Sequence, residues 1–492
     1  MRSILAKRTG WPVKLIVPVS VLLAAWVGRA IALGGQFRMM ALGITALALL
    51  PAVVPALRLR ERFGHSYMAV EIPLLFLLVS TLVFRQRDAE DLASNPLDPA
   101  GLFRVAFVFA GLFLGLIALT STAEADSSAI RSRPFRLYAV YVIVVFIGAP
   151  LSVEPLQTAY RGLELAAGWI VIAGARHVLG AEGVPRLERT LYWYLVGIAA
   201  TVWGGVILVP GLAVTGTDFA LGASPIPWQI NGVFPSVSSN GVGDLGSTLL
   251  LWSLAYRLTP NRSYGPRPGL ATALTALGFL TLIGAQYRTG YLAAAAGLAV
   301  ILAVRKRAML AALAVVAVLL AGIWGSVLVT RAEPYVLRGQ TTEAATELSG
   351  RLYWWENALP VWRESPIFGK GLLTATRFEV LEELGAGETS TIHGTWIEAL
   401  VGTGIVGAGV LLITVLILWK RSIAAALRRP GALVPIVLLT QMSVRSFTGP
   451  TFETFGRGAL IILVLALVLP DRAWGGRHSP AGEHIPLAHR AG

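Results

Sequence analysis

His393 is the residue of this sequence whose type and position best suit acid–base chemistry. It lies where a long polar stretch meets an apolar run that starts near Thr395. A histidine at such a boundary is wet enough to titrate near neutral pH and close enough to a helix bundle to be held in place, the two requirements of a general base. A lone histidine at a boundary is also often just a polar residue at the end of a span, and that alternative stays open.

Two arginines are candidates for binding an anion. Arg288 lies in Gly284-Ala-Gln-Tyr-Arg-Thr-Gly290, a short turn between two apolar segments, and Arg351 opens a Trp-rich stretch. The planar guanidinium matches phosphate oxygens, and an arginine held at membrane depth is costly unless it meets an anion. The alternatives are snorkelling to lipid headgroups for Arg288 and an ordinary loop position for Arg351. Arg445, at the predicted end of a span, gives a weaker indication.

Three further residues are candidates for binding a substrate. Arg161 is three residues from Glu164 on one predicted helix face, where the two charges can also simply neutralise each other. Glu398 lies five residues after His393, where it could line the same cavity or orient a neighbour. Asn240 ends a Gly-rich polar segment that could hydrogen-bond to a sugar or form an ordinary turn.

One grouping of acids raises the question of a metal site. Asp88, Glu90 and Asp91 have the oxygen ligands that suit magnesium or manganese. They lie among Arg85 and Arg87 in a predicted loop, which favours a solvated run of charges. The sequence contains no cysteine, so thiolate chemistry is excluded. No metal and no cofactor is predicted.

The elements that must position these residues are membrane spans. The chain is 55% hydrophobic and 14% charged, too apolar for a soluble protein of 492 residues. Most long segments are apolar runs of about 17 to 25 residues, the length that crosses a hydrocarbon core. The sequence predicts an all-α, polytopic transmembrane bundle of about fourteen spans (12–14), at 12–33, 39–57, 67–84, 101–120, 136–151, 160–178, 190–211, 242–258, 269–286, 290–304, 308–329, 395–419, 431–447 and 457–470.

The spans divide the chain into four parts. We expect a membrane bundle of spans 1–11 over residues 1–329, a long outer loop over 330–394, spans 12–14 over 395–470, and a disordered cytoplasmic tail over 471–492. The net charge of +14 follows from basic residues concentrated in the loops that this arrangement places inside. This is the positive-inside pattern, which explains the positive charge without a nucleic-acid partner. It places both termini in the cytoplasm.

The long loop is predicted to contain an amphipathic helix. Leu352, Trp355, Leu359 and Trp362 recur at three- and four-residue steps, the spacing of one helix face. Pro360 is expected to kink or end this helix. Tryptophans at a membrane boundary favour a helix in the interface, either as a lid over a cavity or simply resting on the bundle.

Taken in order, these motifs resemble the bacterial O-antigen ligase and O-antigen polymerase superfamily of integral membrane enzymes. The resemblance covers roughly residues 150 to 410. The matching pieces are Leu151-Ser-Val-Glu-Pro before Arg161, Gly232-Val-Phe with Asn240, Gln286-Tyr-Arg-Thr-Gly290, Arg351 and Trp355 followed by Pro366-Ile-Phe-Gly-Lys-Gly371, and His393-Gly-Thr-Trp with Gly404-Ile-Val-Gly407.

The resemblance implies a metal-independent membrane glycosyltransferase of the cell envelope. Such an enzyme moves glycan from a polyprenyl (undecaprenyl) diphosphate donor to a sugar or lipid acceptor on the outer face of the cytoplasmic membrane, with polysaccharide assembly proteins as possible partners. It selects His393 and Arg288 as catalytic, with Arg351 next, and the substrate-binding candidates are then Arg351, Arg161, Glu398, Asn240 and Trp355. Ligase and polymerase differ in the acceptor, and that choice stays open.

Three features depart from the family's pattern. Gly394 stands where an asparagine often follows the histidine, and Gln229 and Ile230 stand where a basic residue often precedes Gly-x-Phe. Fourteen predicted spans exceed the usual twelve or so.

Two other classes of function remain as alternatives. A transporter or lipid flippase predicts inverted repeats, broken helices and paired charges at the midplane. No clear repeat is found, and most charges on the predicted outer side lie at span ends or in loops. A non-catalytic membrane partner of a polysaccharide assembly complex is compatible with the same fold if the departures have disabled the site.

Overall fold

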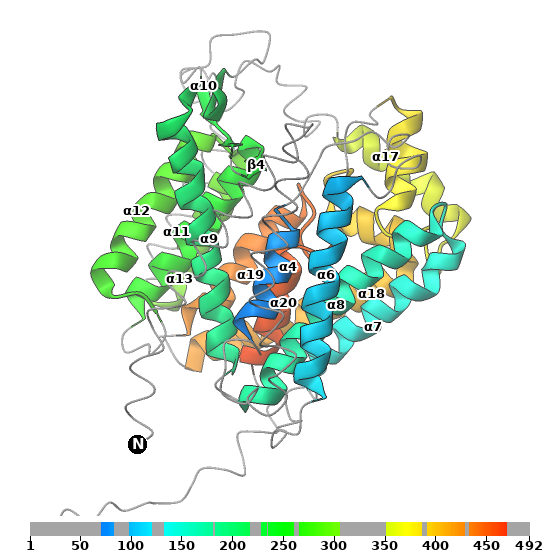
Figure 1. The fold of residues 1–492 in the computed structure, drawn as a ribbon, viewed down its shortest axis with the longest axis horizontal. Helices are drawn as coiled ribbons and strands as arrows, with labels where there is room; N and C mark the ends of the chain where they lie inside the picture. Colours follow the sequence, from blue (N-terminus) through cyan, green and yellow to red (C-terminus); the bar gives the residue numbers. More distant parts are fainter. Residues whose placement is uncertain are drawn as a thin grey trace, which may run out of the picture.

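The protein is largely helical, with two short β-hairpins. The computed structural model describes residues 70–82, 98–120, 132–180, 183–216, 228–233, 235–259, 265–305, 351–385, 391–428 and 432–469. Its helices are α4 (Glu71–Ser80), α6 (Pro99–Leu119), α7 (Arg133–Gly148), η3 (Ala149–Leu151), α8 (Pro155–Leu179), α9 (Gly183–Leu208), α10 (Pro210–Ala213), α11 (Ser239–Leu258), α12 (Pro268–Ala285), α13 (Arg288–Val304), α17 (Arg351–Glu364), the π-helix η5 (Thr376–Leu381), α18 (Thr395–Arg428), α19 (Leu433–Ser446) and α20 (Arg457–Val468). The long helices form one bundle, and α10, β4 and α17 lie at the same end of it (Figure 1).

The membrane-spanning helices agree with the hydropathy of the sequence. Every predicted span within 67–304 and 395–470 overlaps a helix. Within the described part of the chain, six helices are long and apolar enough to cross a membrane, and α4, α13, α19 and α20 are shorter apolar helices. The multi-pass membrane class is therefore confirmed. The predicted spans 12–33, 39–57 and 308–329 lie outside the described residues, as do Asp88, Glu90, Asp91 and the tail 471–492, so the count of fourteen stays a prediction.

Glycines let neighbouring helices approach closely. A Cβ on Gly246 of α11 would lie 2.5 Å from the Leu282 nitrogen of α12, and one on Gly278 of α12 would lie 2.4 Å from the Leu250 nitrogen of α11. Reciprocal contacts of this kind are typical of helices that pack in lipid through small residues. Large apolar side chains such as Phe113 and Ile143 remain 54% and 55% exposed, as expected where lipid covers the bundle.

The polar segment around Asn240 forms hairpins at one end of the bundle. Strand β1 (Val214–Gly216) pairs antiparallel with β2 (Trp228–Ile230), and β3 (Gly232–Val233) pairs with β4 (Ser236–Val237). The Asn231 amide donates to Thr215 Oγ1 at 2.7 Å, so this polar side chain stabilises the hairpin itself. Asn240 follows in the first turn of α11, where it is exposed.

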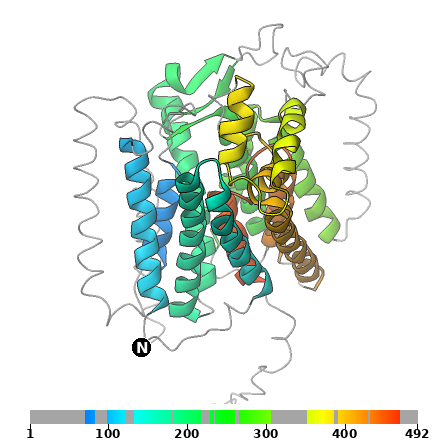
Figure 2. The same ribbon diagram turned by 90° about the vertical axis from the view of Figure 1, so that its right-hand side faces the viewer.

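Helix α17 and the π-helix η5 form a layer at this end of the bundle, with a small apolar core of their own. Ala358, Val380, Leu381, Ile392 and Val401 are buried together, and Trp354, Trp355 and Trp362 pack against them. The predicted amphipathic helix is therefore present. Figure 2 shows α17, in yellow, at the same end as the strands.

One detail of the predicted amphipathic helix is wrong. Leu352 is 40% exposed, and the buried face instead contains Trp354 and Ala358. Of the two effects expected of Pro360, a kink or an end, the helix does not end there but continues through it. Pro360 is exposed, so the Glu356 carbonyl that loses its helical partner lies on a face where other donors can reach it.

Helix α18 is broken at Gly404, and a glycine-rich loop occupies the break. Gly404 has φ 63° and ψ −172°, so the helix consists of two segments. The loop 366–371 runs along the break: Lys370 N donates to Val401 O at 3.0 Å, Gly371 N to Gly402 O at 3.1 Å, and Ile405 N to Pro366 O at 2.9 Å. The loop thus satisfies backbone groups that the broken helix leaves unpaired.

The chain just after this loop is tied to the segment 152–158 by hydroxyl groups. Ser152 Oγ, Thr158 Oγ1 and Thr374 Oγ1 lie 2.7 to 2.9 Å from one another and are buried. Val153 N donates to Lys370 O at 3.3 Å. Two of the sequence motifs, Leu151-Ser-Val-Glu-Pro and Pro366-Ile-Phe-Gly-Lys-Gly, are therefore parts of one structural unit under the α17 layer.

Candidate active site

His393 lies immediately before α18, in the apolar layer that α17 covers. Its backbone has φ 53°, the left-handed region that few side chains adopt. Its ring lies 5.9 Å from the Trp354 ring, and Nδ1 lies 3.5 Å from Thr391 Oγ1. Strained backbone conformations persist where the surrounding structure over-determines them, and they cluster at functional sites.

Trp355 fixes the segment that carries His393. Its indole Nε1 donates to Ile392 O at 3.0 Å. A Cβ on Gly394 would lie 3.0 Å from Nε1 and Cζ2 of the same ring. Gly394 therefore makes room for the indole, which gives a physical reason for the glycine that departs from the family's asparagine.

Arg288 and Arg351 each begin a helix, and their charges interact. Arg288 is the first residue of α13, and Arg351 is the first residue of α17. Burial lowers the pKa of Arg351, the neighbouring Tyr287 raises it, and the positive charge of Arg288 lowers it again. The positive charge of Arg288 thus acts unfavourably on Arg351, and an anion bound beside both arginines would offset this repulsion.

The chain before Arg288 is held in an unusual turn. Gln286 has φ 52°, and its side-chain amide donates to Trp228 O of β2. Gln286 caps α12 and Tyr287 caps α13, so the turn between the two helices is short. The hairpin β1–β2 thus fixes the direction in which α13 begins.

The positive charges of Arg351 and Arg445 also act on His393. Burial lowers the pKa of His393 to about 4, and the charges of Arg351 and Arg445 lower it in the same direction. The expectation that His393 titrates near neutral pH is therefore wrong for the free protein, because the side chain is more buried than its position at a boundary suggests. His393 is neutral at pH 7, the state in which an imidazole can accept a proton.

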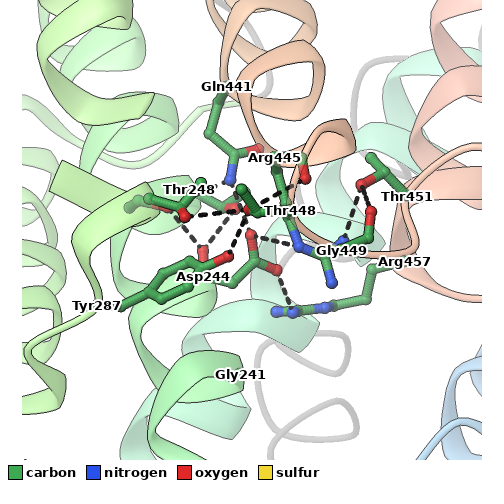
Figure 3. Close-up of polar contacts among 12 residues, drawn as sticks. Gly241, Asp244, Thr248, Tyr287, Gln441, Arg445, Thr448, Gly449, Thr451 and Arg457 are labelled. Atoms are coloured by element: carbon green, nitrogen blue, oxygen red, sulfur yellow. Dashed lines mark hydrogen bonds and ion pairs between the residues drawn. The ribbon is translucent and has the colours of Figure 1, made fainter. Parts of the chain in front are cut away.

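Arg445, one of the two arginines whose charges act on His393, is paired with the buried carboxylate of Asp244 (Figure 3). Asp244 is 4% exposed, and its Oδ1 lies 3.0 Å from Arg445 Nε. Oδ2 lies 2.6 Å from Nη2 of Arg457, and Gln441 Nε2 donates to Oδ1 at 2.9 Å. The cavity beside these residues is about 20 Å³, room for about one water molecule, so it is a packed junction and not a ligand pocket.

A comparison with known families matches the segment that contains His393, Arg288 and Arg351. Residues 273–412 match the O-antigen ligase family model, Wzy_C. The matched segment runs from α12 into α18 and contains all three residues, so the predicted resemblance to the superfamily is confirmed. A comparison with curated proteins finds no match.

Two predicted substrate-binding residues lie in other environments. Arg161 Nη1 lies 2.9 Å from Glu164 Oε2, and Arg104 Nη2 lies 2.6 Å from Glu164 Oε1, so Arg161 belongs to an ion-paired group on α6 and α8. This agrees with the mutual neutralisation of Arg161 and Glu164. Asn240 is exposed on α11, one turn before Asp244. Their roles with a substrate stay predictions.

Glu398 lies beneath the His393 segment. It is 1% exposed and accepts a hydrogen bond from Thr376 Oγ1 of η5 at 2.5 Å. Its backbone nitrogen donates to Gly394 O at 2.9 Å. Of the two possibilities the sequence raised, these contacts favour orienting the neighbouring segment.

Asp244, Tyr287 and Arg457 are not among the residues predicted from the sequence. Asp244 lies inside the predicted span 242–258, and an acid within a span is an indication of function in itself. Tyr287 lies in the motif Gln286-Tyr-Arg-Thr-Gly290, which could have marked it, whereas nothing local marks Arg457, because its partner Asp244 is distant in the sequence.

Proposed function

We propose that this O-antigen ligase-like chain is a glycosyltransferase that moves glycan from a polyprenyl diphosphate donor to a sugar or lipid acceptor. The observation that carries the proposal is a neutral His393 among the charges of Arg351 and Arg445, with Arg288 adjoining, in the segment that matches the family. The reaction would take place on the outer face of the cytoplasmic membrane, with both termini in the cytoplasm, as the distribution of basic residues suggests.

The residues suggest an inverting displacement. The acceptor hydroxyl attacks the anomeric carbon of the donor while His393 takes its proton, the new glycosidic bond forms, and the bond from that carbon to the diphosphate oxygen breaks. Arg288 and Arg351 stabilise the charge that builds on the departing diphosphate. No step of this mechanism requires a metal ion or a cofactor.

The anionic donor would itself make His393 a better base. In the free protein, arginine charges help to hold the His393 pKa at about 4, too low for an efficient base at pH 7. A bound diphosphate offsets these charges, so it raises the His393 pKa toward neutrality. Binding of the donor and activation of the base are thereby linked.

Lipid-linked glycan extracted from cells tests the proposal. Cells with His393→Ala or Arg288→Ala should accumulate the diphosphate-linked glycan and lose the mature product, as cells without the protein do. Arg363→Ala is the matched control, because Arg363 is exposed on α17 and should leave transfer unchanged. The length ladder of the missing product separates polymerase from ligase.

Wild-type product from a well-folded His393→Ala protein would remove His393 as the base. An identical lipid-linked pool in all strains would remove the transferase proposal altogether.

A further inference from the structure

The turn between α19 and α20 touches the segment that carries Arg288. Thr448 Oγ1 in this turn donates to Thr289 Oγ1 at 3.0 Å. The Tyr287 hydroxyl lies 3.5 Å from the same Thr448 oxygen. The two neighbours of Arg288 in the sequence are therefore both held by one residue of the turn.

The same turn touches the segment that follows His393. Thr395 Oγ1 donates to Gly449 O at 3.1 Å, and Trp396 Nε1 donates to Ser446 Oγ at 3.2 Å. Residues 445–451 thus form a bridge between the start of α13 and the start of α18. Any displacement of this bridge changes the position of Arg288 relative to His393.

Arg445 anchors the bridge at its first residue. Its Nε pairs with Asp244 Oδ1 at 3.0 Å, and its Nη1 donates to Thr451 Oγ1 at 3.4 Å. Thr451 Oγ1 donates to Gly449 O at 3.1 Å, and the Thr451 nitrogen donates to Glu453 Oε2 at 3.0 Å. The side chain of Arg445 therefore spans the bridge from one end to the other.

The anchor carries excess positive charge. Asp244 is one carboxylate between two guanidinium groups, Arg445 and Arg457, so the group has a net charge of about +1 at pH 7. A bidentate or forked contact of arginine fixes geometry as well as charge, and lysine cannot reproduce it.

We propose that Arg445, held by Asp244, is a positioning residue of the transferase site: it fixes the 445–451 bridge that sets Arg288 against His393, and it adds positive charge beside His393. The inference rests on the proposed transferase function. Arg445 acts through the bridge and through the electric field, without contact to the reacting atoms.

Charged and titratable groups from several elements act on His393 or on the two arginines that do. Arg351 of α17 and Arg445 of α19 act on His393 itself. Tyr287 and Arg288 at the start of α13 act on Arg351, and Asp244 of α11 and Glu453 of the α19–α20 turn act on Arg445. Glu398 of α18 is buried five residues beyond His393. Arg351 and Arg445 are the two whose charges lower the pKa of His393. Removal of Arg445 therefore has a definite sign: the pKa of His393 rises.

The experiment is the pH dependence of kcat/KM for purified protein in proteoliposomes, with lipid-linked glycan extracted from the null strain as donor. Arg445→Gln should lower kcat/KM by about 10- to 100-fold, because small misplacements of catalytic groups cost that much. It should also move the acid limb upward by about one pH unit, the effect of one nearby charge. Arg445→Lys should keep the wild-type pH midpoint of the acid limb, because it keeps the charge, but should lower kcat/KM, because lysine lacks the forked contact.

Arg363→Gln is the matched control. Arg363 is an exposed arginine of α17 and is not part of the anchor or of the bridge described above. Its replacement should leave the acid limb in place and kcat/KM within about threefold of wild type.

Several outcomes overturn the proposal. Wild-type kcat/KM and an unmoved acid limb in Arg445→Gln would do so. A loss of kcat/KM in Arg445→Gln with no shift of the acid limb would also do so, because it indicates a structural role alone. If Arg445→Gln fails to fold, Arg445→Lys decides, because wild-type kcat/KM in that variant contradicts positioning by the fork. An active His393→Ala protein would instead refute the proposed function, independently of Arg445.

Discussion

Gly404→Ala should loosen the loop 366–371 from α18, because the break in α18 depends on a residue without a side chain. Gly404 has φ 63°, and its Cβ would lie 2.2 Å from Ile367 O. A left-handed conformation costs alanine about 1 to 2 kcal/mol, and overpacking costs about 1 to 3 kcal/mol. The loop should therefore lose about 2 to 5 kcal/mol of local stability.

Trypsin cleavage after Lys370 measures this loss. Lys370 is ion-paired with Glu364 and Glu379 at 2.7 Å, and its backbone nitrogen is bonded to Val401 O, so cleavage there requires the loop to open. When opening is fast relative to cleavage, the rate follows the population of the open form. A loss of 2 kcal/mol raises that population about 30-fold.

Gly409→Ala provides the matched control on the same helix. No atom lies within 4 Å of a Cβ at Gly409, and alanine in a helix is more stable than glycine by about 0.8 to 1 kcal/mol. Cleavage after Lys370, identified by the mass of the fragments, should be unchanged in this variant. Equal cleavage rates in Gly404→Ala and Gly409→Ala would refute the idea that the glycine is needed to dock the loop.

Three further predictions concern the site and its side of the membrane. Gly394→Asn should displace the Trp355 indole and lower transfer at least 10-fold, whereas wild-type transfer would contradict the tight contact. Because the chain lacks cysteine, single cysteines report the side of the membrane. Tyr353→Cys, at a side chain that is 57% exposed, should react with a membrane-impermeant maleimide in spheroplasts, and Leu427→Cys, at a side chain that is 73% exposed, should react only in inverted vesicles. The reverse pattern would show that the proposed topology is inverted. Finally, as pH decreases, kcat/KM should fall with a midpoint near pH 4, where His393 of the free protein becomes protonated. The midpoint for kcat should lie at a higher pH, because bound diphosphate raises the pKa of His393. Equal midpoints for kcat and kcat/KM would contradict the link between donor binding and activation of the base.

The sequence predicts the spans well because the length and composition of an apolar run are local properties. It also gives His393 and Arg288 as candidates, since each stands in a short motif beside a span, and Arg351, which opens the Trp-rich stretch of the long loop; their roles stay predictions. The pairing of Asp244 with Arg445 could not be predicted in this way, because the two residues are about 200 residues apart. The sequence marks Asp244 only as an acid inside a span and Arg445 only as a weak candidate at a span end. Such pairs depend on how helices pack, which periodicity does not specify.

The amphipathic helix shows the limit of periodicity more directly. Spacing identifies a face of α17 through Trp355 and Trp362, and both indeed pack in the layer. Spacing does not show which residues beside this face are also buried. In the structure Trp354 packs against the small core, whereas Leu352 is exposed. The partners of α17 decide this, and they are residues distant in the sequence, such as Val380 and Leu381 of η5 and Val401 of α18.

The broken helix bears on the choice between transferase and transporter. In transporters, breaks near the midplane expose helix ends to a substrate or an ion. At Gly404 the loop 366–371 instead fills the break, and Ile405 N and Lys370 N find partners within the protein. The break thus joins α18 to the layer that holds His393, and a rigid joint at that place suits a site whose groups must keep their spacing during a displacement.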